Sequence, residues 1–373
     1  MNETRIDFLY LDEQDMIKAG VLDMPKCIET IDEMFAVMGT GDYLFGGPRE
    51  NDHGIMIWFP REPRTEKMPK QGPDRRFMAM PAYLGGKFYV CGNKWYGSNR
   101  ANVEQGLPRS ILTMVLNDVD TGAPLAFMSA NLLSAARTGA VPGVATKYLQ
   151  KSDASIVGVI GAGNINHSCS EAILHKIHQK GEVKVYDVLF DKAVSFCEEM
   201  QEKTGVKFTP VKKLCEAVKG CDIVSIAASG SKPVVLEDDW LDPGVVVILT
   251  GAASLSENMY AKSRIVCDNW KMHKEFVYEM RDIPELLEGT THITAPELCS
   301  AFLAGKIDEN NIQDLGAIAA NPAVGRKDDK EIFLFVTGGM PTEDVAWAHA
   351  CYETAKEKGI GQKLRLWDEP YRK

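Results

Sequence analysis

The sequence predicts an α/β protein with two domains, and three observations support this fold class. Short apolar runs alternate with helical patterns from residue 151 to about residue 330, which is typical of a doubly wound parallel sheet. Residues 1–150 instead contain short alternating segments between Gly- and Pro-rich turns, which predict a mixed, largely antiparallel α+β region. A chain of 373 residues is also long enough for two domains.

The N-terminal part predicts one amphipathic helix and several strands. A strand at 6–10 precedes a helix that carries Ile28, Ile31 and Phe35 on one face. The segment at 61–76 predicts an exposed loop. Residues 131–149 are small and apolar and predict a tightly packed helix, which Pro142 and Gly143 should kink or break. The remaining strands of this part are expected at 54–59, 76–80, 88–92, 110–117 and 124–129.

The parallel sheet should begin after residue 152. Its strands are expected at 155–160, 183–187, 207–209, 221–226, 245–249 and 264–267, with helices at 169–180, 191–204 and 211–219. A strand at 331–336, a turn at 338–344 and a helix at 345–358 follow, and we expect this tail to pack onto the first domain. The predicted domains are therefore 1–150 with 330–373, and 151–329.

Charge and composition exclude several classes of protein. The formal net charge is −10, whereas nucleic acids and anionic membranes require a basic surface. No apolar run reaches the roughly 18 residues of a membrane span, and the N-terminus lacks the apolar core of a signal peptide. The nine cysteines are scattered without a C-x-x-C pair, and the seven histidines show no metal-ligand spacing. We expect a cytoplasmic protein without a metal centre.

The stretch GVIGAGNINH at 158–167 predicts a dinucleotide-binding turn. Gly161 would allow the tight turn, and Gly163 would let the backbone approach a pyrophosphate at the helix N-terminus. A bare G-x-G also fits a plain strand–turn–helix, and Asn166 occupies the position of the usual third small residue, where we expect it to loosen the helix–strand contact. Asp187 follows the next strand, where a carboxylate binds ribose hydroxyls and repels a 2′-phosphate. This context favours NAD over NADP.

Three cationic side chains are candidates for binding an anion. Lys94 lies among aromatic residues and glycines, so it either binds a carboxylate or is a solvated loop lysine. Arg49 has the same two alternatives. Arg137 lies among small residues, and it either pairs with an acid or reaches a phosphate.

Taken together, these motifs resemble the ornithine cyclodeaminase/μ-crystallin family over nearly the whole chain. Within that family, the stretches at 79–86 and 94–98 resemble the branch that contains N-(2-amino-2-carboxyethyl)-L-glutamate dehydrogenase and imine reductases. The motifs that carry the resemblance lie at 79–81, 92–94 with 106–108, 120–124, 136–139, 158–163, 222–224 with 243–244, and Gly338 with 343–344.

The resemblance implies a fold, an assembly and a class of reaction. It implies a Rossmann domain inserted into a substrate-binding and dimerisation domain, and a homodimer. It implies that NAD moves a hydride to or from the carbon that bears an amino or imino nitrogen.

The resemblance also implies roles for single residues. Arg49 and Lys94 would hold the substrate carboxylate, with Gly338 also at the substrate. Apart from the resemblance, we expect Lys94 to be the catalytic proton donor. Arg137 would bind a cofactor phosphate. The other implied cofactor-binding residues are Thr138, Gly161, Gly163, Asn164, Ile165, Asp187, Thr250, Gly251 and Thr337.

One departure from the family pattern directs the functional hypothesis. Ala253 stands where the cyclodeaminases carry a catalytic aspartate, and Glu257 stands where they carry a lysine. Alanine cannot serve the distal amine in ring closure, whereas reduction of an imine needs chiefly the positioning of a hydride. The sequence therefore predicts an NAD-dependent amino-acid dehydrogenase or imine reductase. The alternatives are a cyclodeaminase-type ammonia lyase and a non-catalytic NAD-binding protein.

Overall fold

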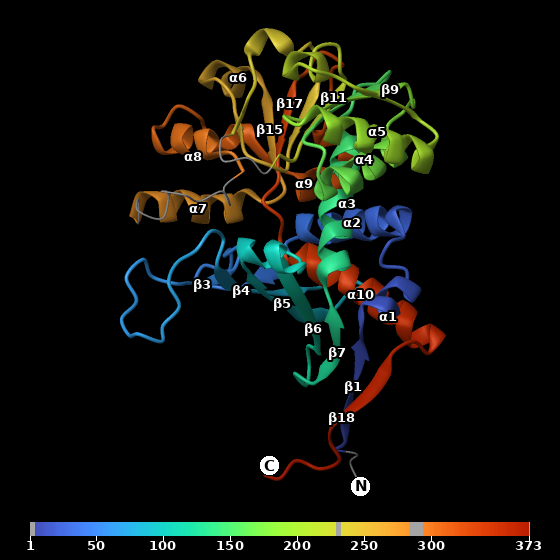
Figure 1. Cartoon of the computed structure of the whole chain (residues 1–373), viewed down its shortest axis with the longest axis vertical. Coiled ribbons are helices and arrows are strands. Elements are labelled where there is room, and N and C mark those ends of the chain that lie inside the picture. Colours follow the sequence, from blue (N-terminus) through green and yellow to red (C-terminus); the bar gives the residue numbers. More distant parts are fainter. Residues whose placement is uncertain (1–3, 229–232, 283–293, 373) are drawn as a thin grey trace. The chain divides into compact units, whose positions relative to one another are not determined.

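The computed structural model describes residues 4–228, 233–282 and 294–372, and these form two compact units. Unit 1 comprises residues up to Asp23, Asp42–Arg137 and residues from Met340 onwards. Unit 2 comprises Met24–Gly41 and Thr138–Gly339. Figure 1 labels the helices and strands of both units. No helix in the described ranges is both long and apolar enough to cross a membrane.

Unit 1 is a mixed, largely antiparallel sheet, as the sequence predicts. The strand order is β18-β1-β7-β6-β5-β4-β2, with β3 paired to β4, and only the β1–β7 pairing is parallel. Helix α10 packs against β4, β5 and β6. The elements are β1 (Ile6–Leu11), α1 (Glu13–Lys18), β2 (Tyr43–Phe45), β3 (Ile55–Trp58), β4 (Arg76–Leu84), β5 (Val90–Ser98), η1 (Arg100–Gln105), β6 (Ser110–Asp118), β7 (Pro124–Ser129), α10 (Pro341–Lys358) and β18 (Gln362–Trp367).

Unit 2 is a doubly wound parallel sheet, which confirms the predicted fold class. Its order is β10-β9-β8-β11-β13-β17-β15-β16, and every pairing is parallel. The strands are β8 (Ile156–Ile160), β9 (Glu182–Tyr186), β10 (Lys207–Pro210), β11 (Ile223–Ile226), β13 (Val246–Leu249), β15 (Arg264–Cys267), β16 (Ile312–Asp314) and β17 (Phe333–Val336). The central strands are apolar throughout because both faces of such a sheet are covered.

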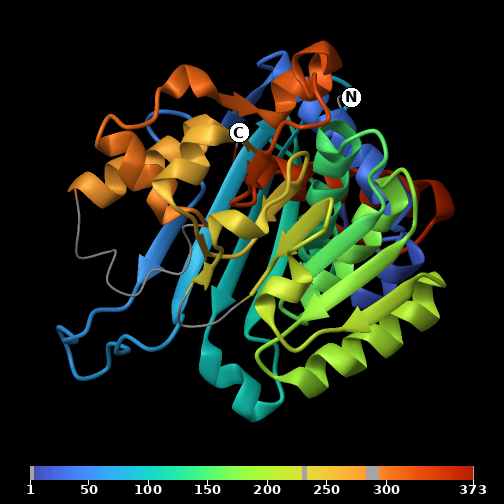
Figure 2. The same cartoon turned by 90° about the horizontal axis from the view of Figure 1, so that it is seen from above.

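Helices accompany the strands of unit 2. Figure 2 shows the yellow-green helix α5 running beside β9 and β10. The helices are α2 (Met24–Gly39), α4 (Asn164–Lys176), α5 (Phe190–Thr204), α6 (Glu257–Lys262), α7 (Trp270–Asp282), α8 (Pro296–Leu303) and α9 (Leu315–Ala320), with short 3-10 turns at η2 (Leu214–Ala217), η3 (Asp238–Trp240), η5 (Glu309–Asn311) and η6 (Pro322–Val324). A separate two-stranded pair joins β12 (Val234–Val235) to β14 (Ala253–Ser254).

The compact units differ from the predicted domain limits at three places. Residues 138–150 lie in unit 2 rather than in the first domain. Strand β17 lies between β13 and β15 in the parallel sheet, so unit 2 extends to Gly339 rather than to residue 329. Helix α2 belongs to unit 2, where its last residue, Gly39, packs so closely on Gly316 of α9 that a Cβ would lie 2.2 Å from the Gly316 carbonyl oxygen. The differences at β17 and α2 arise from contacts between residues far apart in the sequence, which local periodicity does not reveal.

Helix α3 (Asn131–Leu149) is continuous, so of the kink or break expected at Pro142 and Gly143 the break does not occur. An interior proline costs about 3 kcal/mol in an isolated helix. In unit 2, however, the small residues of α3 allow close packing on α4, where Gly139 meets Ser168 and Gly143 meets Ala172. This packing stabilises the helical backbone on the C-terminal side of Arg137.

Candidate active site

A row of backbone hydrogen bonds joins the carboxyl ends of the parallel strands. In each case the first residue after a strand donates its amide to the last residue of the neighbouring strand. The five bonds are Gly161 to Tyr186, Ala227 to Ile160, Thr250 to Ile226, Thr337 to Leu249 and Asp268 to Val336. This edge of a doubly wound sheet is where such folds bind ligands. It brings most of the predicted cofactor residues of unit 2 together.

The glycine turn has the geometry of a phosphate-binding loop. Gly161 has φ +96°, which favours glycine, and a Cβ there would lie 2.9 Å from the Ala227 carbonyl oxygen. Gly163 is the N-cap of α4, and a Cβ built on it would meet no described atom within 4 Å. No side chain of the described residues caps this N-terminus, and Asn164 and Ile165 form the first turn. These amides therefore fit a dinucleotide pyrophosphate.

Asn166 ties α4 to the sheet, which corrects our expectation that it would loosen the contact. Its side chain is fully buried. Its amide nitrogen donates to the carbonyl oxygens of Ile160 and Gly161 at 2.9 and 2.7 Å, and its oxygen accepts from Ser225 Oγ at 3.0 Å. A small residue at this position permits close packing, whereas this asparagine replaces packing with three hydrogen bonds.

Asp187 lies beside the glycine turn. One carboxylate oxygen accepts from the Ala162 amide at 2.8 Å, and the other accepts from the Leu189 amide at 2.9 Å. The carboxylate is thereby oriented at the end of β9. This geometry fits a ribose diol, which would hydrogen-bond to the same carboxylate.

The ends of β11 and β13 approach each other closely. The amides of Thr250 and Gly251 both donate to the Ile226 carbonyl, at 3.0 and 2.7 Å. A Cβ on Gly251 would lie 2.9 Å from the Ala228 amide nitrogen. Glycine is therefore needed at 251 for packing within this edge of the sheet.

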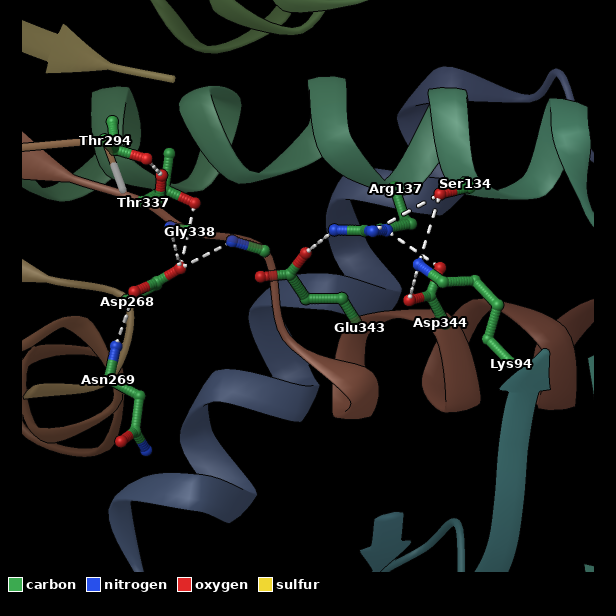
Figure 3. A network of polar contacts seen from close by, with 11 residues as sticks. Lys94, Ser134, Arg137, Asp268, Asn269, Thr294, Thr337, Gly338, Glu343 and Asp344 are labelled. Atoms are coloured by element: carbon green, nitrogen blue, oxygen red, sulfur yellow. Dashed lines mark hydrogen bonds and ion pairs between the residues drawn. The ribbon is translucent and has the colours of Figure 1, made fainter. Parts of the chain in front are cut away.

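The sequence analysis missed Asp268, which organises the residues after β17. This buried carboxylate accepts hydrogen bonds from Thr337 Oγ1 and from the amides of Gly338 and Gly339 (Figure 3). It also accepts from the Asn269 amide and lies 2.7 Å from His273 Nε2. Its position directly after the apolar run of β15 was the signal available in the sequence.

Electrostatics keep Asp268 ionised. Burial would raise the pKa of Asp268, but His273 and the backbone amides outweigh burial and lower it. The ionised carboxylate can then accept all of these donors. It fixes the conformation of Thr337 and Gly338, two residues that we predict to contact cofactor and substrate.

In unit 1, four charged side chains form one buried network (Figure 3). Lys94 Nζ lies 2.6 Å from Asp344 Oδ2, and Arg137 donates to Glu343 Oε2 at 2.5 Å and to Asp344 Oδ1 at 2.9 Å. Ser134 Oγ lies within 3.5 Å of both cations. The two acids occupy the first turn of α10, where the helix dipole favours negative charge.

The network bears on the alternatives for Lys94 and Arg137 without testing their roles toward a ligand. Lys94 is a buried residue of strand β5 and not a solvated loop lysine. Arg137 pairs with two acids, which is the first of its two alternatives, and its role toward a phosphate stays a prediction.

The surroundings also shift the pKa values of the two cations in opposite directions. Burial and the charge of Arg137 lower the pKa of Lys94 to about 8, against the opposing effect of Asp344. For Arg137, burial would lower the pKa, but the charges of Asp344 and Glu343 outweigh burial and raise it. Arg137 is therefore a permanent cation, whereas Lys94 exchanges its proton near neutral pH.

The remaining predicted residues have less defined surroundings. Arg49 is exposed on the loop between β2 and β3, where its carbonyl oxygen accepts from Asn51. Its grip on a substrate carboxylate stays a prediction. Thr138 lies on α3 at the start of the unit 2 part of that helix.

The two departures from the family pattern have ordinary structural roles. Ala253 is fully buried in β14 and belongs to the apolar core of unit 2. Glu257 begins α6 and pairs on the surface with Lys306. Ala253 has no proton donor or acceptor in its side chain, and the Glu257 carboxylate is engaged by Lys306.

The doubly wound sheet, the glycine turn and the carboxylate after β9 define a protein of the dinucleotide-binding class. Residues 21–359 match the model of the ornithine cyclodeaminase/mu-crystallin family, and the chain belongs to this family.

Two similar proteins are named as dehydrogenases. Alanine dehydrogenase of Archaeoglobus fulgidus is 32% identical over 298 residues, covering 78% of this chain and 83% of that protein. N-((2S)-2-amino-2-carboxyethyl)-L-glutamate dehydrogenase of Staphylococcus aureus is 26% identical and covers 97% of this chain and 99% of its own.

Solved structures extend this similarity to the whole fold. The Delta(1)-pyrroline-2-carboxylate reductase of Thermococcus litoralis, solved with NADH and L-proline, matches with a TM-score of 0.76 and 28% identity. The match covers 95% of this chain and 99% of that one. An archaeal alanine dehydrogenase dimer with bound NAD gives a TM-score of 0.77 at 25% identity, covering 97% and 100%.

The contact between Asp268 and His273 predicts that their contributions to the free energy of unfolding are strongly coupled. Asp268→Asn should destabilise the protein by about 3–5 kcal/mol, because an amide cannot accept every donor and leaves buried partners unmatched. His273→Gln should cost little more in the Asp268→Asn background, with a coupling energy of at least ~1 kcal/mol. Urea unfolding of the two single variants and the double variant measures this coupling. Additive losses, or a loss no larger than that of the exposed control Asp153→Asn, would contradict the assigned role.

Proposed function

We propose that this protein is an NAD-dependent oxidoreductase that moves a hydride to or from the α-carbon of an amino or imino acid. The observation that carries the proposal is the dinucleotide-type edge of unit 2 in a chain whose relatives include amino-acid dehydrogenases and imine reductases. A reductive or oxidative reaction at a carbon–nitrogen bond is common to those names.

The residues of unit 2 fit a bound NAD. The amides of Asn164 and Ile165 would hold the pyrophosphate, and Asp187 would hold the ribose. When bound, the nicotinamide supplies or accepts the hydride. Asp187 disfavours a 2′-phosphate by charge repulsion, which supports NAD over NADP.

Lys94 would bind the substrate and move its proton. A charged ammonium at Nζ attracts the substrate carboxylate and can donate a proton to the nitrogen that becomes an amine. A pKa of about 8 for Lys94 leaves both protonation states accessible near neutral pH. Arg49 would add a second contact to the same carboxylate.

Ala253 argues against cyclodeamination. Ring closure requires a group that manages the distal amine and its protons, and a buried methyl group supplies none. Oxidation of an amine or reduction of an imine makes no such demand. Alanine at position 253 is therefore compatible with an amino-acid dehydrogenase or an imine reductase.

The apolar outer face of the unit 1 sheet supports a homodimer. Helix α10 covers one face, and the opposite face exposes Phe77, Trp95 and Ile111 on neighbouring strands. Phe77 and Trp95 stack with ring centroids 5.8 Å apart, and Ile55 and Ile57 of β3 extend the patch. Exposed apolar patches of this kind mark contact surfaces. A second copy is the proposed partner because a similar solved protein is a dimer.

A cytoplasmic location remains part of the proposal.

The activity should prefer NAD(H) as cofactor. With a panel of amino acids, or of α-keto acids with an amine, the reduced-nicotinamide absorbance should change with NAD(H) more than with NADP(H).

The activity should also depend on Lys94 and on its protonation. For imine reduction, kcat/KM should fall as pH rises through about 8, because the proton on Lys94 is lost. For amine oxidation it should rise through the same pH.

Lys94→Met should lower kcat/KM by at least about 100-fold and leave NADH affinity nearly unchanged. Lys18→Met is the control, since Lys18 also pairs with an aspartate but is largely exposed. No turnover with any substrate despite NADH binding would overturn the oxidoreductase proposal in favour of a binding protein.

The oligomeric state should depend on the apolar face. Trp95→Lys should lower the mass measured by light scattering from twice 41.2 kDa toward 41.2 kDa, because it places a charge in the patch. Val188→Lys, at an exposed position in unit 2, should leave the mass unchanged. A wild-type protein of single-chain mass at micromolar concentration would contradict the dimer.

A further inference from the structure

A second cation lies on the same face of the unit 1 sheet as Lys94. In β4 and β5, Met80 pairs with Lys94, Met78 with Tyr96, and Arg76 with Ser98. Directly paired residues point to the same face, as do alternate residues along a strand. Arg76 therefore lies on the same face of the sheet as Lys94, with the Met78–Tyr96 pair between them. The Arg76 side chain is only 14% exposed.

Tyr96 lies between the two cations. Lys94 Nζ is 5.7 Å from the centre of the Tyr96 ring, and the Arg76 guanidinium carbon is 5.8 Å from it. Arg76 also lies 5.2 Å from the Trp58 ring and donates to the Tyr96 hydroxyl at 3.4 Å. The aromatic rings hold the guanidinium plane in place.

The surroundings of Arg76 carry an excess of positive charge. Asp74 pairs with Arg76 and with Arg109 and accepts from Ser98 Oγ, so two guanidiniums share this carboxylate. The Arg76 Nε atom is buried, and among the described residues it has no hydrogen-bond acceptor. Arg76 therefore shares one carboxylate with Arg109 and keeps positive charge for a further anion.

We propose that Arg76, supported by Trp58 and Tyr96, binds a second carboxylate on the substrate side chain, so that the substrate is a dicarboxylic amino or imino acid. This inference rests on the proposed function, in which Lys94 binds the α-carboxylate. Charge and bidentate geometry make an arginine selective for a carboxylate over a methyl or an amide group. Tyr96 would separate the two carboxylate sites.

Matched substrates test the inference. L-glutamate, L-glutamine and L-norvaline share a five-carbon chain but end in a carboxylate, an amide and a methyl group. The wild-type protein with NAD should oxidise L-glutamate with at least a tenfold higher kcat/KM than the other two. Arg76→Met should remove this preference by lowering kcat/KM for L-glutamate toward that for L-norvaline. Arg76→Lys should retain part of it, and the neighbouring control Arg75→Met should retain all of it.

A binding measurement separates this inference from the proposed function. In the presence of NADH, glutarate should bind the wild-type protein at least tenfold more tightly than pentanoate by calorimetry, and Arg76→Met should abolish the difference. Absent turnover with this selectivity intact would overturn the proposed function and leave the subsite standing. Equal binding of glutarate and pentanoate by the wild-type protein would overturn the subsite, as would an equal loss for both ligands in a folded Arg76→Met variant.

Discussion

The buried pairing of Lys94 and Arg137 with Asp344 and Glu343 is the interaction on which unit 1 depends. Each charge would be costly to bury alone, and removal of one partner from such a pair leaves an uncompensated charge. Together the four side chains join β5, α3 and the first turn of α10. The network therefore determines the structure around Lys94 as well as its charge.

A short segment links this network to the edge of the parallel sheet. Within eight residues, 337–344, the chain supplies Thr337 and Gly338 to unit 2 and Glu343 and Asp344 to unit 1. In unit 2, Asp268 holds the first two residues through hydrogen bonds. In unit 1, the two acids hold Arg137 and Lys94. Carboxylates therefore fix both ends of the segment, which runs from the residue after β17 into the first turn of α10.

Much of this architecture follows from local sequence patterns. The apolar runs predicted the parallel strands because a sheet covered on both faces favours apolar residues at every position. The glycine turn and Asp187 could be assigned because their spacing is short and tied to one strand–turn–helix. The placement of β17 between β13 and β15 could not, since strand order depends on pairings between distant residues.

The charged network shows the same limit. Lys94 and Arg137 could be recognised as unusual cations, but their partners lie more than 200 residues away in the sequence. Asn166 differs from the expectation because its hydrogen bonds to Ile160 and Ser225 offset the effect of its larger size. Asp268 was missed because one aspartate after an apolar run is common.

The central claim is that a buried lysine, held charged by Asp344, serves the carbon–nitrogen chemistry. The pH dependence of kcat/KM for amine oxidation in Asp344→Asn tests it most directly. Asp344 raises the pKa of Lys94 against burial, so its neutral isostere should move the apparent pKa of the profile from about 8 down by at least about one pH unit. A folded, active variant whose profile stays at the wild-type pH, or moves upward, would contradict the account.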